Sequence, residues 1–277
     1  MAEVRGKLRI GFTQIQCSAD HKQNLQQLMK CVDWAYENQV DLIITPEASL
    51  SGYHPEFHSQ ELVDSLQLLE NYARDNSIAM CLGTLWKESD GSVRNQIRSY
   101  NKLGQLVSTH NKILLTKLDL DCGVVQGTSL NLIPIEAEDH EGNICNIVAA
   151  GLICADLYGA EGCVNLPKLA QDNGAKILLH STNANRNVDK THDKVTRDWN
   201  TAHLQMISWL SKMPIVTVDN SACPNGELWD GPTSSPSGVL INGEWAITVP
   251  DTGNHMQYWD FDVDNYKDIN YTSNSKI

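Results

Sequence analysis

The sequence predicts an α/β fold in a single domain. Apolar runs rich in β-branched residues alternate with longer stretches of helical period, which is typical of strands joined by crossover helices. No internal repeat, low-complexity tract or Pro/Gly/Ser-rich linker divides the chain, so residues 1–277 are expected to form one unit. Hydrophobic residues make up 41% and charged residues 20% of the sequence, a composition that permits a sizeable core.

The first third of the chain predicts strands alternating with amphipathic helices. Residues 8–15 and 41–45 are short apolar runs and are predicted to be strands. The segment between them has apolar residues on one face at helical spacing, which predicts a helix over residues 19–37. A second amphipathic pattern predicts a helix over residues 61–73, and the apolar run 78–85 returns as a strand.

The middle of the chain begins with a change of pattern. Two extended runs, 96–100 and 106–110, are joined by a short turn, which predicts an antiparallel hairpin. The largely apolar run 144–154 is long enough for a buried strand. A helix around residues 164–172 and a strand over 175–180 then continue the βαβ order.

The last third starts with a helix and ends with short extended pieces. Helical spacing runs over residues 192–212, Pro214 stops it, and residues 215–218 are predicted to be a strand. Residues 266–277 are polar, so we expect them to be mobile or to pack on another subunit. The remaining predicted extended pieces are residues 238–241, 245–249 and 257–263.

Charge and hydropathy exclude several classes of partner. The net charge is -13, from 34 acidic and 21 basic side chains, so the surface field should repel nucleic acid and anionic membranes. The longest stretches without an ionised group, residues 122–135 and 142–155, are shorter than the roughly 20 apolar residues of a spanning helix. The N-terminus shows no signal-peptide pattern, so a cytoplasmic location is expected.

The cysteines predict free thiols. There are eight of them, scattered without a CxxC pair. A secreted disulfide framework normally occupies a much smaller chain, and a zinc site would need clustered Cys and His ligands. Most of the cysteines are therefore expected to be small core residues. Their positions are Cys17, Cys31, Cys81, Cys122, Cys145, Cys154, Cys163 and Cys223.

Three polar residues follow predicted strands, the position at which open α/β sheets carry reacting groups. They are Glu47, Lys112 and Cys154. Taken singly, Glu47 has an ordinary interpretation as a solvated carboxylate, and Cys154 has one as a packed thiol. Their joint occurrence in this order along the chain favours a functional site.

The segments around these residues resemble the nitrilase superfamily of carbon-nitrogen hydrolases. Residues 45–53 (TPEASLSGY) are similar to its glutamate block, and residues 110–112 (HNK) to its lysine block. Residues 151–156 (GLICAD) resemble its nucleophile block, in which a strand ends in Cys. The resemblance covers nearly the whole chain. It implies a four-layer α-β-β-α sandwich that associates through helical faces into a homodimer or larger homo-oligomer.

The resemblance also implies a chemistry that these residue types can perform. An amide carbon is a poor electrophile, so attack calls for a thiolate, which needs basic or cationic neighbours at neutral pH. Cys154 would attack the carbonyl carbon, and Glu47 would take the thiol proton and later deliver it to the leaving nitrogen. Lys112 and the backbone N–H of Ala155 would stabilise the oxyanion. No cofactor is implied.

A second acidic residue is expected between the lysine and the cysteine. The family usually has a glutamate there, some six residues before a glycine that closes the block. In this sequence the place holds Asp121, ahead of Gly127. The shorter side chain would have to reach the site from a shifted backbone, and Asp119 is a neighbour that could substitute for it.

The substrate class is expected to be a small non-peptide amide. True nitrilases of the superfamily follow the cysteine with Trp-Glu, whereas this chain has Ala155-Asp156, which favours amides over nitriles. The family draws substrate contacts from the regions of Tyr53, Ala155, Tyr158, Asn183 and Trp199, although the aromatic residues are also explained as core or rim residues.

Other functions stay open from the sequence. An N-carbamoyl hydrolase or an acyltransferase would use the same thioester. A catalytically silent binding subunit is permitted by the change to Asp121. A metal site is weaker, because His54 and His58 enclose Pro55 and have no convincing third ligand nearby, so no metal is expected.

Overall fold

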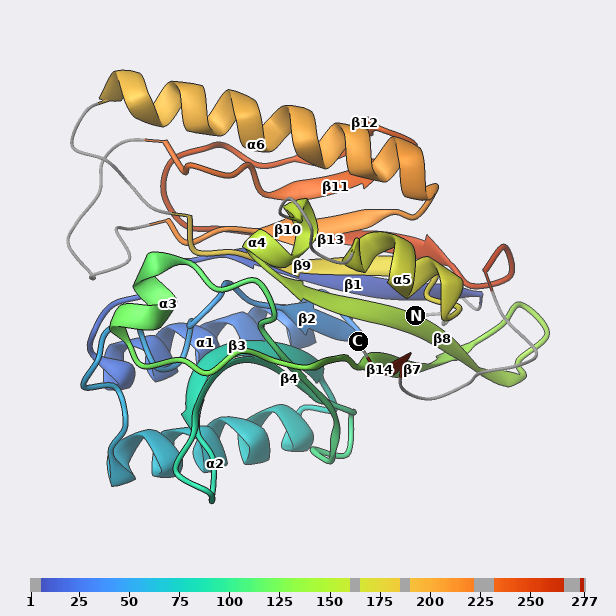
Figure 1. The fold of residues 1–277 in the computed structure, drawn as a ribbon. Helices are drawn as coiled ribbons and strands as arrows, with labels where there is room; N and C mark the ends of the chain where they lie inside the picture. Colours follow the sequence, from blue (N-terminus) through green and yellow to red (C-terminus); the bar gives the residue numbers. More distant parts are fainter. Residues whose placement is uncertain (1–5, 160–164, 185–189, 222–231, 267–274, 277) are drawn as a thin grey trace.

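Two β-sheets lie face to face with helices on their outer faces, so the molecule has four layers (Figure 1). The computed structural model describes residues 6–159, 165–184, 190–221, 232–266 and 275–276. Helices α1 (His21–Glu37) and α2 (Gln60–Asp75) cover one sheet. Helices α5 (Leu166–Asp172) and α6 (Lys190–Ser211) cover the other. The predicted α-β-β-α sandwich is confirmed.

In the described part of the chain, the first sheet has six strands in the order β13-β1-β2-β3-β4-β5. Strands β1, β2 and β3 are parallel, β13 and β4 pair antiparallel with β1 and β3, and β5 pairs antiparallel with β4. The predicted hairpin is present as β4 and β5. The strands are β1 (Lys7–Gln14), β2 (Leu42–Ile44), β3 (Ala79–Lys87), β4 (Val93–Tyr100), β5 (Leu106–Asn111) and β13 (His255–Asp262).

The second sheet repeats this arrangement in the order β7-β8-β9-β10-β11-β12. Strands β8, β9 and β10 are parallel, and β7, β11 and β12 are antiparallel to their neighbours. The strands are β7 (Leu132–Glu138), β8 (Ile144–Ile153), β9 (Ile177–Ser181), β10 (Ile215–Val218), β11 (Gly238–Ile241) and β12 (Glu244–Thr248).

One edge strand ties the end of the chain to its beginning. The strands of the second sheet, β7 to β12, are consecutive along the sequence. β13 follows them, yet it pairs with β1 of the first sheet. The last strand of the run therefore returns to the sheet in which the chain began.

Three apolar cores separate the four layers. The central core fills the space between the two sheets, where Phe12 and Ile44 of the first sheet meet Ile147 and Val216 of the second. An outer core lies between α1, α2 and the first sheet, and another between α5, α6 and the second sheet. Parallel strands buried on both faces require continuous apolar runs, which is the pattern that predicted them.

The two sheets are joined by polar contacts where β2 and β9 end. The Ser181 hydroxyl donates to the carbonyl oxygen of Thr45 (2.7 Å). The backbone N–H of Glu47 donates to the carbonyl oxygen of Thr182 (3.3 Å), and that of Cys154 donates to Ser181 (2.9 Å). The carboxyl ends of β2, β8 and β9 therefore meet at one place, which is where the site must be sought.

Among the described residues, the sequence did not predict the strands β6, β7 and β14 or two short helices. β7 contains Pro134, which argues against a central strand, but β7 is an edge strand, where a proline is tolerated. The short helices are α3 (Lys117–Asp121) and α4 (Ala155–Tyr158). Most of the predicted tail, 266–277, lies outside the described residues. Within it, β14 (Ser275–Lys276) pairs with β6 (Ser129–Leu130) of the same chain.

The cysteines and the helices agree with the sequence where the structure describes them. Cys31, Cys81, Cys122 and Cys154 are free thiols. Cys163 and Cys223 lie outside the described residues. Among the helices that are described, none combines the length and the apolar character needed to cross a membrane.

Candidate active site

Glu47 is held on a tight turn that follows β2. Its side chain is 1% exposed, and its Oε2 accepts a hydrogen bond from the backbone N–H of Asn183 (2.9 Å). The turn packs directly on β3 at Gly83. A Cβ atom at Gly83 would lie 2.1 Å from the carbonyl oxygen of Pro46, so only glycine permits this approach. Two strands therefore fix the direction of the Glu47 carboxylate.

Lys112 follows β5 and is also 1% exposed. Its backbone N–H donates to the carbonyl oxygen of Asn95 (2.8 Å) on the neighbouring strand, which extends the hairpin to the site. The ammonium group lies between two carboxylates: Nζ is 2.7 Å from Oε1 of Glu47 and 2.7 Å from Oδ2 of Asp119. An ammonium has three N–H donors, so one remains beyond these two bonds.

Asp119, and not Asp121, is the acidic residue that the structure brings to Lys112. Asp119 is fully buried on α3, and its Oδ2 accepts hydrogen bonds from the backbone N–H and the hydroxyl of Thr116 (2.8 Å each). Asp121 is 52% exposed and pairs with Lys117 (2.6 Å). Residues two apart on a helix point to roughly opposite sides, so only one can face inward. Asp121 therefore lies outside the cluster.

Tyr53 and Asn95 complete the buried polar cluster. Asn95 Nδ2 donates to Oε1 of Glu47 (2.7 Å) and to Oδ1 of Asp119 (2.8 Å). The Tyr53 hydroxyl also donates to Oδ1 of Asp119. Tyr53 was expected to contact substrate, and in the structure its hydroxyl is bound to the carboxylate. Asn95 was not predicted as a site residue, although it directly precedes the extended run 96–100 of the predicted hairpin.

Cys154 lies between the end of β8 and the short helix α4. Its backbone has φ 47° and ψ -108°, a conformation that L residues rarely adopt and that persists only where the surroundings hold it. Cys154 is half-buried, and its thiol interacts electrostatically with both Glu47 and Lys112. The three residues that the sequence singled out therefore meet, although they lie 65 and 42 positions apart along the chain.

The two carboxyl groups of the cluster differ in their affinity for protons. Burial raises the pKa of Glu47 above its ordinary value, against the effect of the Lys112 ammonium, and the charge of Asp119 raises it further. Burial also raises the pKa of Asp119, but Lys112 and the hydrogen bonds to the carboxylate outweigh it and leave that pKa below its ordinary value. Asp119 is thus the fixed charge, and Glu47 is the group that takes up a proton more readily.

The thiol and the ammonium are both in their protonated forms at neutral pH. Burial, followed by the charge of Glu47, raises the pKa of the Cys154 thiol to about 12, although Lys112 and Thr182 act to lower it. Burial lowers the pKa of Lys112, but the charges of Glu47, Cys154 and Asp119 outweigh it and raise that pKa above its ordinary value. The thiol proton must therefore be removed as the sulfur attacks.

Asp156 ties the cysteine and lysine segments together. It is fully buried, and its Oδ1 accepts hydrogen bonds from the backbone N–H groups of Ile113 (3.0 Å) and Leu114 (2.8 Å). Its Oδ2 is 2.9 Å from Nε2 of His110. The residue two positions after the nucleophile candidate thus holds the chain that follows Lys112.

The profile of the family described as carbon-nitrogen hydrolase matches residues 9–251, a range that includes the whole cluster. The chain belongs to the carbon-nitrogen hydrolase family. Among curated proteins it is similar to a hydrolase of Schizosaccharomyces pombe, with 28% identity over 178 residues that cover 62% of this chain and 54% of the relative. It is also similar to the omega-amidase NIT2 of Mus musculus, with 25% identity over 62% of each chain.

The alignments with these two relatives span little more than half of each relative's length. Among solved structures, the fold is similar to the amidase from Nesterenkonia sp. AN1. One mutant of that amidase shows covalent addition of the acetamide moiety of fluoroacetamide at its active-site cysteine. It has a TM-score of 0.75 and 19% identity and covers 96% of this chain and 95% of its own. Another mutant, in complex with butyramide, has a TM-score of 0.75 and 18% identity, with 95% of each chain covered.

The other predicted substrate contacts of this carbon-nitrogen hydrolase lie around the same cluster. Asn183 is buried: its backbone N–H bonds Glu47, and its side-chain oxygen accepts from Asn220 (3.0 Å). Tyr158 packs edge-on against His180 and Trp199, with ring centroids 5.6 Å and 5.1 Å away. Ala155 provides the first N–H group of α4. Asn183 thus positions Glu47. Contact of Asn183, Tyr158 and Ala155 with substrate is a proposal.

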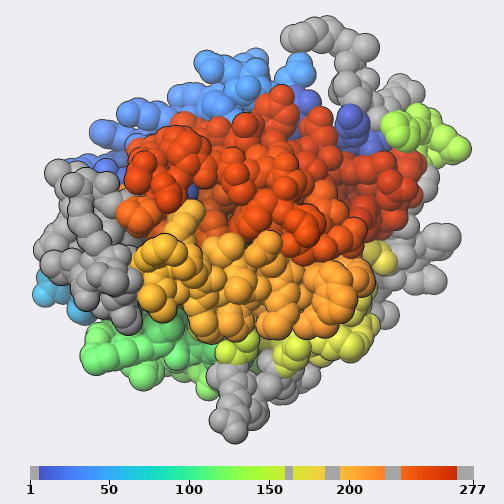
Figure 2. Space-filling model, turned by 90° about the horizontal axis from the view of Figure 1, so that it is seen from above, coloured from blue at the N-terminus to red at the C-terminus, as the bar shows by residue number. Residues whose placement is uncertain are grey.

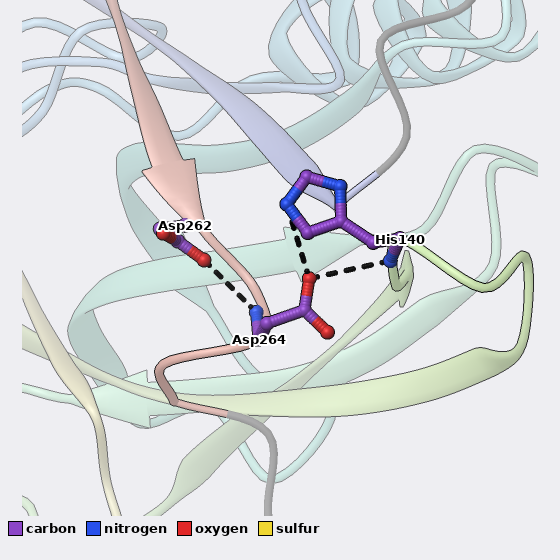
Figure 3. Close-up of side chains that lie close together, drawn as sticks. All are labelled: His140, Asp262 and Asp264. Atoms are coloured by element: carbon purple, nitrogen blue, oxygen red, sulfur yellow. Dashed lines mark hydrogen bonds and ion pairs between the residues drawn. The ribbon is translucent and has the colours of Figure 1, made fainter.

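A group of potential metal ligands lies elsewhere on this carbon-nitrogen hydrolase. Within the described part of the chain, His140, Asp262 and Asp264 come together (Figure 3). Nε2 of His140 is 3.4 Å from Oδ2 of Asp264, and the backbone N–H of Asp264 donates to Asp262 (3.1 Å). Asp262 pairs with Lys7 at the amino end of β1, at the opposite end of the sheet from Glu47. This group has no part in the cluster around Lys112.

A cavity of about 860 Å³ also opens away from the cluster. Its walls include Arg9, Asp41 and Ala79, which lie at the amino ends of β1, β2 and β3. The cluster lies at the carboxyl ends of parallel strands, where open α/β sheets carry their sites. We therefore place the candidate active site at Cys154 and not in this cavity.

Proposed function

We propose that this carbon-nitrogen hydrolase cleaves a small non-peptide amide through a thioester on Cys154, with ammonia or an amine as the leaving group. The observation that carries the proposal is the buried contact of Lys112 with Glu47 and Asp119 beside the Cys154 thiol. Amide cleavage needs a nucleophile, a group that takes and returns a proton, and a donor to the oxyanion. The cluster supplies one residue for each task.

Glu47 has the properties of the proton carrier. Its raised pKa makes it a better base than an exposed carboxylate, and that is what a thiol with a raised pKa requires. As the sulfur of Cys154 attacks the carbonyl carbon, the thiol proton passes to Glu47. The same proton then passes to the substrate nitrogen, the C–N bond breaks, and ammonia or an amine leaves.

Lys112 and the backbone N–H of Ala155 are the proposed donors to the oxyanion. The carbonyl oxygen becomes negatively charged in the tetrahedral intermediate, and the third N–H of Lys112 is available to it. Lys112 is fixed by its bonds to Glu47 and Asp119, and a donor fixed in this way needs no reorganisation during the reaction. Removal of one oxyanion donor commonly lowers kcat by about a hundredfold or more.

Water completes the reaction on the thioester. Glu47, which has given up its proton to the leaving group, takes a proton from a water molecule as that water attacks the thioester carbon. The C–S bond then breaks, the carboxylic acid is released, and the proton returns to the sulfur of Cys154. The cycle restores both groups to their starting states and requires no cofactor.

Asp119 supports an active enzyme over a silent binding subunit. The silent alternative depended on the replacement of the family's second glutamate by Asp121. In the structure, the buried carboxylate that lies 2.7 Å from Lys112 belongs to Asp119, two positions before Asp121. The shorter side chain reaches the ammonium because α3 begins close to it, with Thr116 at its N-terminus. We therefore assign to Asp119 the role of holding Lys112.

Relatives support the amide class. The Nesterenkonia amidase whose fold this chain shares was studied with butyramide and fluoroacetamide, and the mouse relative is an omega-amidase. We propose a small amide as the substrate, with an N-carbamoyl compound as the alternative, because both acylate the thiol in the same way. The Ala155-Asp156 sequence after the nucleophile favours both of these over a nitrile.

Helix α6 supports the proposal of a homodimer. Figure 2 shows α6 as the orange band across one face of the molecule. Apolar side chains that are about half exposed or more gather on one side of this helix, a pattern that marks contact surfaces. The exposed residues of α6 are Val195, Trp199, Met206, Trp209 and Leu210.

A cytoplasmic location also remains a proposal, supported by free thiols such as those of Cys31, Cys81 and Cys122.

The test is a screen for ammonia release from small amides, ureido acids and nitriles, with Cys154→Ala and Cys81→Ala as a matched pair. Cys81 is a buried thiol whose pKa is also raised to about 12 by burial, but it lies in the core between the sheets. We expect turnover of amides by the wild type and by Cys81→Ala, and none by Cys154→Ala. Turnover by Cys154→Ala, or no turnover of any compound by the wild type, would overturn the proposal.

A further inference from the structure

His180 lies beside the nucleophile segment and is not used by the proposed chemistry. It is a fully buried residue of β9, paired with Leu152 of β8 on one side and with Thr217 of β10 on the other. Its Nε2 is 3.2 Å from the carbonyl oxygen of Cys154, and its Nδ1 is 2.9 Å from the hydroxyl oxygen of Thr217. Both ring nitrogens therefore have defined partners.

These partners fix the proton on the ring. A carbonyl oxygen only accepts hydrogen bonds, so Nε2 of His180 must carry the hydrogen and donate it to Cys154. In the neutral ring Nδ1 then accepts from the Thr217 hydroxyl. Burial, with a smaller contribution from Lys112, lowers the pKa of His180 to about 4 although Asp156 and the Cys154 carbonyl act to raise it. The ring is therefore neutral at pH 7.

The carbonyl that His180 binds belongs to the peptide that joins Cys154 to Ala155. No described peptide bond is cis, so the Ala155 N–H points away from the carbonyl oxygen. A donor that holds the Cys154 carbonyl oxygen therefore also sets the direction in which the Ala155 N–H points. The backbone N–H of Leu157 is the second donor to this oxygen (3.1 Å). Two donors on one oxygen are consistent with a peptide whose orientation is under constraint.

The strained backbone of Cys154 explains why such a constraint is needed. With φ 47° and ψ -108°, the residue is outside the favoured regions, at a cost of about 1–3 kcal/mol that neighbouring contacts must offset. Rotation of the peptide toward a relaxed conformation would turn the Ala155 N–H away from its direction in the structure. That rotation would break the hydrogen bond from His180 to the Cys154 carbonyl oxygen, so the bond opposes it.

We propose that His180 is a positioning residue that holds the Cys154–Ala155 peptide so that the Ala155 N–H faces the oxyanion. The inference rests on the proposed function, in which that N–H is one of the two oxyanion donors. His180 does not touch the substrate and exchanges no proton in the reaction. Its loss should weaken stabilisation of the tetrahedral intermediate while leaving the thiol and Glu47 in place.

Amide turnover and alkylation of the thiol separate this role from a merely structural one. Hydrolysis passes through an oxyanion, whereas displacement of iodide from iodoacetamide by sulfur does not. We would compare the wild type with His180→Leu, His180→Gln and Thr217→Val. The Gln side chain keeps an N–H near the position of Nε2, and Thr217→Val removes only the partner of Nδ1. His255→Leu is the control, since His255 Nε2 bonds the Thr252 carbonyl (2.7 Å) outside the cluster.

We expect His180→Leu to lower kcat for amides about ten- to a hundredfold with KM nearly unchanged, less than complete removal of an oxyanion donor. The rate at which iodoacetamide alkylates Cys154 in this variant should stay within about twofold of the wild-type rate, because alkylation forms no oxyanion. His180→Gln should recover most of the kcat. Inhibition by an aldehyde analogue of the substrate, which adds to the thiol and forms an oxyanion-like group, should weaken in parallel with kcat.

Several outcomes would overturn the inference. They are an unchanged kcat in His180→Leu, an equal loss of turnover and of alkylation, or no recovery in His180→Gln. If His180→Leu does not fold, as judged by circular dichroism, Thr217→Val decides: kcat must fall while alkylation does not. Failure of the proposed function is distinct from all of these, because the wild type itself would then release no ammonia.

Discussion

Asp119→Asn and Asp121→Asn make the same chemical change two residues apart on α3, and the structure predicts opposite consequences. The Asp119 carboxylate accepts hydrogen bonds from Lys112, Thr116, Asn95 and Tyr53. An amide has one oxygen to accept with, and its NH2 group would face donors. The Asp121 carboxylate has an exposed ion pair with Lys117, one turn of helix away.

The expected losses of stability differ several-fold. Removing one partner of a buried ion pair costs about 3–5 kcal/mol, and we expect the lower end because Glu47 still pairs with Lys112. A loss of about 3 kcal/mol lowers Tm by about 6–12 °C in a domain of this size. An exposed pair at i,i+4 contributes about 0.3–0.5 kcal/mol, so Asp121→Asn should lower Tm by no more than about 2 °C.

The pH profile gives a second readout with a defined sign. The charge of Asp119 raises the pKa of Glu47, so its removal should lower that pKa. Glu47 must be deprotonated to act as a base, and activity is lost as the pH falls through its pKa. The acidic limb of kcat/KM should therefore move to lower pH in Asp119→Asn, with kcat reduced about a hundredfold because Lys112 loses a fixed partner. Asp121→Asn should match the wild type.

Thermal unfolding and pH–rate profiles of the two variants, measured side by side, provide the assay. The reasoning is refuted if the two variants lose stability and activity equally, or if Asp121→Asn is the more damaging. It is also refuted if the acidic limb of Asp119→Asn moves to higher pH, because the electrostatic assignment would then have the wrong sign.

Three further predictions concern Gly83, His180 and helix α6. Gly83→Ala would place a Cβ atom 2.1 Å from the carbonyl oxygen of Pro46. We therefore expect the free energy of unfolding, measured with denaturant, to fall by about 1–3 kcal/mol and turnover to be reduced. Wild-type values would contradict the packing argument. The pKa of His180 in the folded state is about 4, against an ordinary value of 6.5. The neutral ring therefore adds about 3 kcal/mol to the free energy of unfolding above pH 6.5, and this contribution is lost as the pH falls toward 4. Acid unfolding curves should show that dependence in the wild type and not in His180→Gln. Met206→Glu on α6 should yield a monomer in sedimentation velocity, whereas Leu68→Glu on the exposed face of α2 should not; a wild-type monomer would refute the dimer.

The sequence predicted the parts of the site that depend on strand order. β2 is an apolar run and β8 a largely apolar one; they are followed by a polar residue and by a cysteine, and parallel strands bring their carboxyl ends to one edge. Glu47 and Cys154 were found in this way. The hairpin that leads to Lys112 was visible from its two extended runs and its turn. These features are local, so a single sequence is enough to predict them.

The parts that were missed depend on tertiary direction. Nothing in the segment around α3 says whether Asp119 or Asp121 faces inward, because a five-residue helix has too few turns to show an apolar face. Asn95 lies in an extended strand and carries no motif, and its role follows only from the position of Lys112. Likewise the pairing of β13 with β1 joins segments far apart in the chain, and periodicity does not reveal such partners.

The central claim is that one sulfur atom forms and releases an acyl group. It is tested most directly by acid quenching of the wild type during turnover of a small amide, followed by mass spectrometry of the intact chain and of its peptides. The account predicts one acyl group per chain, lost on incubation at neutral pH, on the peptide that contains Cys154. Turnover with no adduct on that peptide, or with the adduct on another cysteine, would contradict it.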